Sequence, residues 1–258
     1  MNKKWLAPIP PYLAVWAGLF LFKSAWMTLV GFHIAILLTL LFLRLNLPVN
    51  ILLKSKFPKW ILVSVLICST SGIGLYFLWD LFGIASDLPS QLKNIGLNSS
   101  SWPMFMTYFV LVNPFVEEYF WRGILGSDSK QLYFMDVIFA GYHVMILWGR
   151  VQPFSILFAF AVLTSAGWLW RQIAREDKGL LAPALGHMTA DFSILLTVYW
   201  LTTSLINQTI MARNCSISFV AVCAAGAMRR DTPMYWSKAW TVSGSSIYTE
   251  GTFTVCRA

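Results

Sequence analysis

Long apolar stretches alternate with short polar segments along this chain. A helix needs about 20 predominantly apolar residues to cross the hydrocarbon core of a bilayer. By this measure we predict an interfacial helix near 12–22 and membrane spans near 25–43, 60–79, 102–122, 131–148, 154–170 and 181–206. The predicted fold is therefore all-α, a polytopic transmembrane helical bundle of six or seven spans.

The pattern changes after Ile210. Residues 211–258 are richer in Ser, Thr and Cys and show no clean hydrophobic period. Within them, 217–228 is apolar enough to form a short seventh span, and we predict a disordered tail beyond it. We therefore divide the chain into an N-terminal interfacial segment (1–24), a transmembrane core (25–210) and an atypical tail (211–258).

Composition supports a membrane protein. The 258 residues are 57% hydrophobic and only 12% charged, whereas a soluble domain carries about 25% charged residues. We therefore expect an integral membrane protein with the lipid bilayer as its first partner. We assign it, as an expectation that composition alone does not give, to a bacterial-type plasma membrane. The net charge of +8 fits basic cytoplasmic loops, and no basic stripe interleaved with aromatic residues indicates nucleic-acid binding.

Basic residues are distributed unevenly between the predicted loops. The loops after the first, third and fifth spans carry nine, whereas the loops after the second and fourth carry only Lys93 and Arg150. The positive-inside rule places the first set in the cytoplasm, although Lys3, Lys4 and Lys23 at the other end of the first span argue against this. The nine are Arg44, Lys54, Lys56, Lys59, Arg122, Lys130, Arg171, Arg175 and Lys178.

Three ionisable residues interrupt the third span: Glu117, Glu118 and Arg122. One such residue at mid-bilayer costs roughly 2.5–3.5 kcal/mol on insertion scales. Residues four apart share a helix face, and neighbours diverge by about 100°. We expect Glu118 to pair with Arg122 and Glu117 to point elsewhere as a general base. A purely structural ion network is the competing interpretation.

Two further polar patterns lie in later spans. Phe139 and His143 share one face of the fourth span, where Gly141 permits close helix packing. His187 and Asp191 share one face of the sixth. Each pattern alone also fits a buried histidine or an interhelical hydrogen bond, but their occurrence together favours a site.

The remaining histidine and the cysteines give weaker signals. His33 in the first span is interpreted as an ordinary core or interfacial residue. The four cysteines show no paired spacing typical of zinc sites or of a disulfide framework.

The order Glu-Glu-x-x-x-Arg, Phe-x-x-x-His and His-x-x-x-Asn/Asp on successive helices resembles the CPBP family, also called Abi. This family includes CAAX-type prenyl-protein endopeptidases and bacteriocin-processing and bacteriocin-immunity membrane proteins. The resemblance covers about 102–195, and Gly123 after the arginine suits it. It implies an intramembrane peptidase whose partner is a membrane-associated peptide or protein substrate.

The resemblance also implies catalytic roles by position. Glu117 would activate a water with the help of His143, while His187 and Asp191 would stabilise the oxyanion. Eukaryotic prenyl-protein members carry Asn where this chain has Asp191, which weighs against farnesyl-CAAX substrates rather than against the fold.

Three residues would then support the site, namely Glu118, Arg122 and Phe139. The competing mechanism is zinc-dependent, with Glu117, His143 and His187 as ligands and an open position for water. The sequence has no His-Glu-x-x-His motif, and we favour the glutamate mechanism without a cofactor.

Two other functions remain open. A proton- or ion-coupled transporter would also use buried carboxylates, but no inverted repeat or matching pair of broken helices is present. A non-catalytic immunity or scaffold protein of the same family is the second alternative, although no motif residue has been lost.

Overall fold

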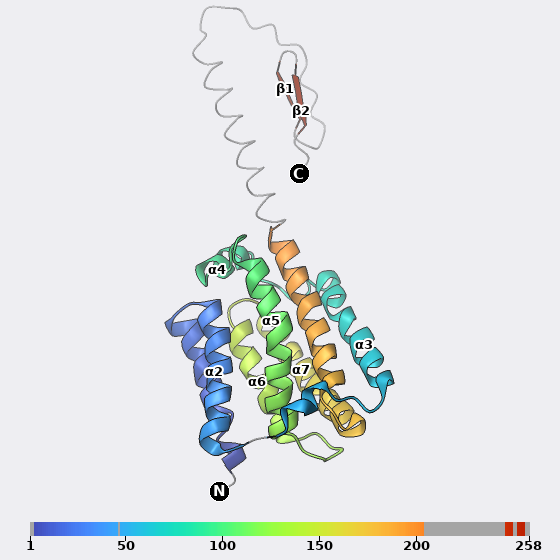
Figure 1. Ribbon diagram of the computed structural model, residues 1–258. Helices are drawn as coiled ribbons and strands as arrows, with labels where there is room; N and C mark the ends of the chain where they lie inside the picture. The colour runs from blue at the N-terminus through green and yellow to red at the C-terminus, as the bar shows by residue number, and fades with distance from the viewer. Residues whose placement is uncertain (1–2, 46, 204–245, 250–251, 256–258) are drawn as a thin grey trace, which may run out of the picture. The chain divides into compact units, whose positions relative to one another are not determined.

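The computed structural model describes residues 3–45, 47–203, 246–249 and 252–255. Contacts divide the chain into two units, Met1–Trp200 and Leu201–Ala258. The helices in chain order are η1 (Lys3–Trp5), α1 (Ile9–Trp16), η2 (Ala17–Leu21), α2 (Ala25–Leu43), η3 (Val49–Leu53), α3 (Pro58–Phe77), α4 (Leu88–Asn94), α5 (Trp102–Glu117), η4 (Glu118–Ile124), α6 (Phe134–Leu147), α7 (Pro153–Asp177) and a last helix, Leu181–Thr203 (Figure 1).

Among the described residues, α2, α3, α7 and the last helix are long and apolar enough to cross a membrane. The segments Ile9–Leu21 and α6 are shorter apolar helices, and α5 continues directly into η4. The helices are nearly all close to their predicted ranges, so the predicted polytopic all-α bundle is confirmed.

The outer face of the bundle is suited to lipid. Phe42 and Phe77 are 80% and 77% exposed, and Leu41 is 73% exposed. Contiguous apolar surface of this kind is unusual on a soluble monomer but is the expected surface in a bilayer. Together with the spanning helices, it identifies an integral membrane protein.

The first α-helix, α1, packs against α2 and α6. Trp5 contacts the ring of Phe134 at the start of α6, with ring centres 4.9 Å apart, and the Tyr12 hydroxyl donates to the carbonyl of Ile138. The N-terminal end of the chain therefore lies beside the start of α6. This places Lys4 near the basic loops, so it no longer argues against the predicted orientation.

Hydrogen bonds join the basic loops at one end of the bundle. The amides of Leu180 and Leu181 donate to the carbonyls of Ile51 and Lys54 over 3.0 and 3.1 Å. At the opposite end the Ala85 amide donates to the Arg150 carbonyl over 2.8 Å. The basic loops therefore meet at one end, as the positive-inside prediction requires.

The segment 171–179, predicted as a charged loop, is mostly helical. Helix α7 continues to Asp177 and ends where Lys178 adopts a left-handed conformation. Two contacts hold this last stretch: Arg171 pairs with Asp136, and Asp177 Oδ1 accepts from the Phe57 amide over 2.6 Å. Composition alone suggested a loop because these partners lie far away in sequence.

The third predicted span is not a uniform α-helix. Its α-helical part ends at Glu117, and Glu118–Ile124 forms a π-helix, in which amides donate to carbonyls five residues earlier. The Leu125 amide donates to the Phe120 carbonyl over 2.9 Å in this way. The following turn is tight, since a Cβ at Gly126 would collide with the Arg122 carbonyl.

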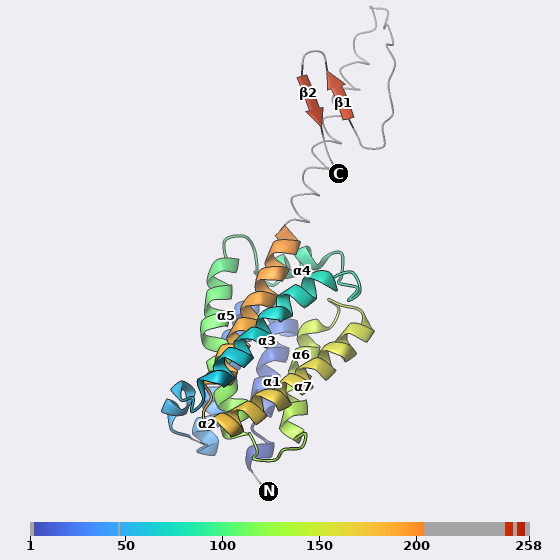
Figure 2. The same ribbon diagram turned by 90° about the vertical axis from the view of Figure 1, so that its right-hand side faces the viewer.

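Helix α3 lies beside the last helix in both views (Figures 1 and 2). The Gly72 amide donates to Ser193 Oγ over 3.1 Å, and Thr197 Oγ1 donates to the Gly72 carbonyl over 3.1 Å. Small residues permit this close approach between backbones. The contact fixes the last helix, which carries His187 and Asp191, against the bundle.

The described part of the tail contains two strands. β1 (Ser246–Thr249) pairs antiparallel with β2 (Thr252–Val255), with Ser246 opposite Val255. The predicted seventh span at 217–228 and the rest of the predicted disordered tail lie outside the described residues.

Candidate active site

Glu117 and Glu118 lie where α5 gives way to the π-helix η4. Their residues are 2% and 0% exposed. Single π-helical turns within α-helices are frequent at functional sites. The two carboxylates face different partners.

The Glu117 carboxylate is held by one of its two oxygens. Oε1 accepts from Asn113 Nδ2 over 2.8 Å and from the Tyr142 hydroxyl over 2.7 Å. Oε2 is buried and accepts no hydrogen bond from the described residues. One oxygen is thus anchored by two donors, and the other is not held by any described residue.

Asn113 and Tyr142 were not predicted from the sequence. Asn113 precedes Glu117 by four residues, the same helical spacing that predicted the pair of Glu118 and Arg122, so this partner could have been found. Tyr142 lies 25 residues after Glu117 on α6. No spacing rule connects residues on separate helices, and packing alone brings them together.

Glu118 lies between Arg122 and His187. Its Oε2 is 3.4 Å from Arg122 Nε, and its Oε1 accepts from His187 Nδ1 over 2.9 Å. The pair of Glu118 and Arg122 is as predicted. The bond to His187 was not predicted, because sequence spacing had linked that histidine only to Asp191.

His187 faces carboxylates on both sides of its ring. Its Nε2 is 3.6 Å from Asp191 Oδ1, which is longer than a direct hydrogen bond. The ring stacks on Trp170 with centres 4.5 Å apart and planes at 21°. Trp170, a residue with no sequence signal, thus fixes the plane of the imidazole.

Phe139 occupies the centre of the predicted motifs. The Arg122 guanidinium lies 3.9 Å above its ring centre, a distance typical of a cation–π contact. The rings of His143 and His187 meet the same phenyl ring edge-on, with centres 5.1 and 6.2 Å away. Phe139 therefore contacts the arginine and both histidines. Its supporting role in the site stays a prediction.

His143 has a defined hydrogen-bond direction. Its Nδ1 lies 3.2 Å from the carbonyl of Phe139, and a carbonyl oxygen can only accept. Nδ1 therefore carries the hydrogen, which leaves Nε2 of the neutral ring as a proton acceptor. Glu117 and His187 both lie close enough to act on His143 electrostatically.

The structure gathers all of the predicted site residues into one region of the bundle. Asp191 faces His187, which also binds Glu118, so the last motif is joined to the first. The three motifs therefore lie close together, although they come from separate helices. The residues assembled are Glu117, Glu118, Arg122, Phe139, His143, His187 and Asp191.

The alternative zinc set consists of Glu117, His143 and His187. Among the described residues, no three His, Cys, Asp or Glu side chains are grouped as metal ligands. Both ring nitrogens of His187 face carboxylates, whereas the bond of His143 Nδ1 to the Phe139 carbonyl leaves Nε2 of that ring open. Glutamate-only and metal-assisted hydrolysis are therefore distinguished by experiment.

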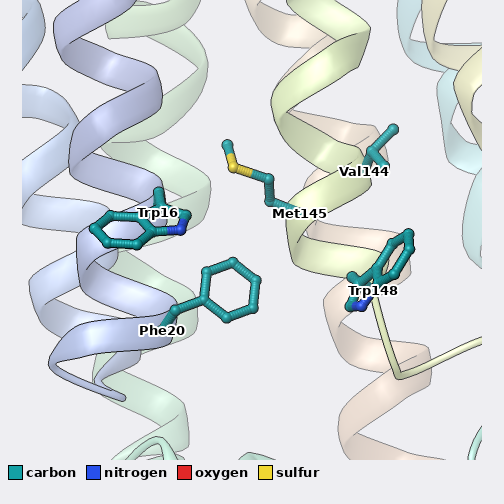
Figure 3. Close-up of a pocket in the computed structure, with 5 residues that line it drawn as sticks. All are labelled: Trp16, Phe20, Val144, Met145 and Trp148. Carbon is teal, nitrogen blue, oxygen red and sulfur yellow. The ribbon is translucent and has the colours of Figure 1, made fainter.

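A shallow apolar pocket opens between η2 and α6 (Figure 3). Val144 and Met145 follow His143 directly in the chain, but neighbouring helical residues diverge by about 100°. The pocket therefore lies on another face of α6 than the polar site. Its lining residues are Trp16, Phe20, Val144, Met145 and Trp148.

Comparison with known proteins agrees with these observations. A family model described as type II CAAX prenyl endopeptidase Rce1-like matches residues 99–193, which contain every predicted site residue. Neither the curated proteins nor the solved structures include a match to this chain. Over residues 99–193, the chain is therefore similar to the Rce1-like type II CAAX prenyl endopeptidases, in agreement with the resemblance that its motifs indicated.

Proposed function

We propose that this protein is an intramembrane endopeptidase in which Glu117 activates the attacking water. The observation that carries the proposal is the asymmetry of the Glu117 carboxylate: Oε1 accepts from two donors, and Oε2 has no donor among the residues that the structure describes. A general base needs a fixed position and an oxygen within reach of the proton that it takes. The anchored Oε1 and the unpartnered Oε2 support Glu117 in that role.

In the proposed reaction, a water donates a hydrogen bond to Glu117 Oε2. The carboxylate takes its proton as the water oxygen attacks the carbonyl carbon of the scissile peptide bond. The proton then passes to the departing amine as the C–N bond breaks. His143 assists by accepting a hydrogen bond or proton at Nε2, the nitrogen that its bond to the Phe139 carbonyl leaves open.

His187 and Asp191 are the proposed oxyanion group. His187 Nδ1 is engaged by Glu118, while Nε2 faces Asp191 over 3.6 Å. A proton held between Nε2 and the Asp191 carboxyl would be available to the developing oxyanion. Stacking on Trp170 keeps this donor in one plane.

Glu118 and Arg122 brace the site in this proposal. Glu118 orients His187, and Arg122 lies between Glu118 and the Phe139 ring. Neither residue needs to touch the substrate. Their role is to hold the two histidines at fixed positions on either side of Phe139.

The proposed substrate is a peptide or protein segment at the membrane. The matched family is described by CAAX prenyl substrates, and the exposed apolar surface of the bundle would admit a lipidated or transmembrane segment. Asp191 replaces the Asn of eukaryotic prenyl-protein members, so unprenylated precursor peptides are tested beside prenylated ones.

The test is cleavage by purified protein in detergent of paired peptides, with and without a farnesyl group on a CAAX cysteine. Glu117→Gln and His143→Ala should abolish cleavage and still melt as folded proteins. Glu176→Gln provides a matched control, because the same exchange is made at a side chain that is 52% exposed. A folded Glu117→Gln variant that cleaves like wild type would contradict the proposal.

A chelator arm separates the two mechanisms. Activity that survives EDTA and dialysis without added zinc is expected for a glutamate-activated water. Activity that disappears with EDTA and returns only with zinc would exclude the metal-free mechanism while leaving the endopeptidase function in place.

A further inference from the structure

His33 lies on α2, outside the residues matched by the family model. It is 4% exposed, as a core residue should be. Yet its Nε2 is 3.1 Å from Asn113 Oδ1, and its Nδ1 is 3.1 Å from the Tyr108 hydroxyl. A histidine with both nitrogens hydrogen-bonded links α2 to the same asparagine that holds Glu117.

The direction of each bond follows from its chemistry. An ionised carboxylate only accepts, so the Asn113 amide must donate from Nδ2 to Glu117 Oε1. The Asn113 carbonyl oxygen then faces His33, whose Nε2 must carry a hydrogen. For a neutral ring, Nδ1 is the acceptor and the Tyr108 hydroxyl donates to it.

We propose that His33 is a positioning residue of the hydrolytic site. By donating to Asn113 Oδ1, it prevents the amide from turning over and presenting that oxygen to the carboxylate. Asn113 Nδ2 thus stays on Glu117 Oε1, which leaves Oε2 for the water. This inference rests on the proposed role of Glu117 as general base.

A purely structural role would give a different result. His33 also joins α2 to α5, so removing it could simply loosen two packed helices. Thr39 provides the comparison, since it is a buried polar residue on α2 whose hydroxyl donates to the Ala35 carbonyl over 2.6 Å within the same helix. Thr39→Val removes a buried hydrogen bond from α2 without touching the site.

The experiment compares kcat and KM for a farnesylated CAAX peptide, or for the unprenylated peptide if only that is cut. His33→Phe keeps an aromatic ring but removes both nitrogens. We expect kcat to fall about 10- to 100-fold with KM nearly unchanged, since a hydrogen bond to a charged group is being indirectly weakened. His33→Gln, which can place an amide donor near the lost Nε2, should restore most of kcat.

A double-variant cycle tests whether His33 acts through Asn113. In an Asn113→Leu protein, His33→Phe should lower kcat by less than about twofold further. Independent, multiplying losses would overturn the proposal, as would a His33→Phe enzyme with the kcat of wild type or of Thr39→Val. Loss of cleavage in Glu117→Gln within the same experiment shows that the proposed function itself still holds.

Two conservative variants decide the matter if His33→Phe does not fold. His33→Gln retains a donor to Asn113 and should keep most of kcat. Asn113→Asp can still accept from His33 but has no amide to donate to Glu117, so it should lose kcat. The opposite pattern would contradict the proposed chain of contacts.

Discussion

Two buried ion pairs in this protein are built in contrasting ways. Arg171 on α7 binds Asp136 on α6 closely. Its Nη2 and Nε atoms lie 2.7 and 2.9 Å from carboxylate oxygens of Asp136. Arg122 approaches Glu118 only through Nε, at 3.4 Å. All four side chains are nearly inaccessible to solvent, so burial does not explain the difference.

The surroundings of the two arginines differ still more. Arg171 also donates to three backbone carbonyls, and Asp136 accepts from the Tyr133 amide. By contrast, Nη1 and Nη2 of Arg122 have no hydrogen-bond partner among the described residues, and the same holds for Oε2 of Glu118. The carbonyls that Arg171 binds are those of Ser127, Ser129 and Gln131.

This contrast distinguishes an ion pair that stabilises the fold from polar groups that we assign to the reaction. A buried polar group without a partner costs roughly 1–3 kcal/mol, and more when charged. A network that serves only stability would satisfy its groups, as the Arg171 cluster does. Unsatisfied groups concentrated around Glu117 and Glu118 are the pattern expected where polar groups are kept for a reaction.

Glu117→Gln should give the largest effect. The amide cannot act as a base, and we expect kcat to fall about 10³- to 10⁴-fold, equivalent to about 4–5.5 kcal/mol in the barrier. The melting temperature should not fall, because a buried carboxylate with one unsatisfied oxygen is replaced by a neutral group. Peptide cleavage and a thermal melt on the same preparation measure both quantities. A large drop in melting temperature would show that Glu117 stabilises the fold and would contradict its assignment to the reaction.

Arg171→Met should destabilise the fold and leave kcat nearly unchanged. Removing one member of a buried, fully bonded ion pair costs about 3–5 kcal/mol, because Asp136 is left charged and buried. The melting temperature should fall sharply, while kcat per folded molecule stays within about threefold of wild type. Adding Asp136→Asn to this variant should recover part of the lost stability, since it removes the unpaired charge. A kcat loss as large as that of Glu117→Gln would contradict the assignment of this cluster to structure.

The sequence predicted the spans and the site motifs for clear reasons. Apolar length identifies membrane helices directly, and the spacing of four residues predicted that Glu118 would meet Arg122. The same rule, applied to Asn113, would have found the donor to Glu117. Contacts between residues of one helix could therefore largely be predicted from their spacing in the sequence.

Contacts between helices were not accessible in this way. Asp136 and Arg171 are 35 residues apart, and without this pair the end of α7 resembles a charged loop. The π-helix at Glu118–Ile124 depends on tertiary packing that no propensity encodes. His33 was correctly expected in the core, but its bond to Asn113 spans 80 residues.

Tyr142→Phe should lower kcat by less than Glu117→Gln does, because it removes only one of the two donors to Glu117. The variant keeps the aromatic packing but removes the hydroxyl that donates to Glu117 Oε1. We expect kcat to fall about tenfold, in line with one lost hydrogen bond to a charged acceptor. Tyr119→Phe is the matched control, because its hydroxyl donates to the Leu47 carbonyl over 2.6 Å outside the site. Equal kcat losses in the two variants would remove the special role of the contact to Glu117.

The smallest effect is expected at the exposed pair of Arg175 and Glu176. Its nitrogen and oxygen are 2.7 Å apart, the same separation as between Arg171 and Asp136, but the Glu176 side chain is 52% exposed. Water solvates both partners, so Glu176→Gln should change the free energy of unfolding by less than about 0.5 kcal/mol and leave kcat unchanged. Thermal melts and peptide cleavage beside Arg171→Met measure this directly. Equal destabilisation in the two variants would show that distance, rather than burial and bonding of the remaining polar groups, sets the strength of these pairs.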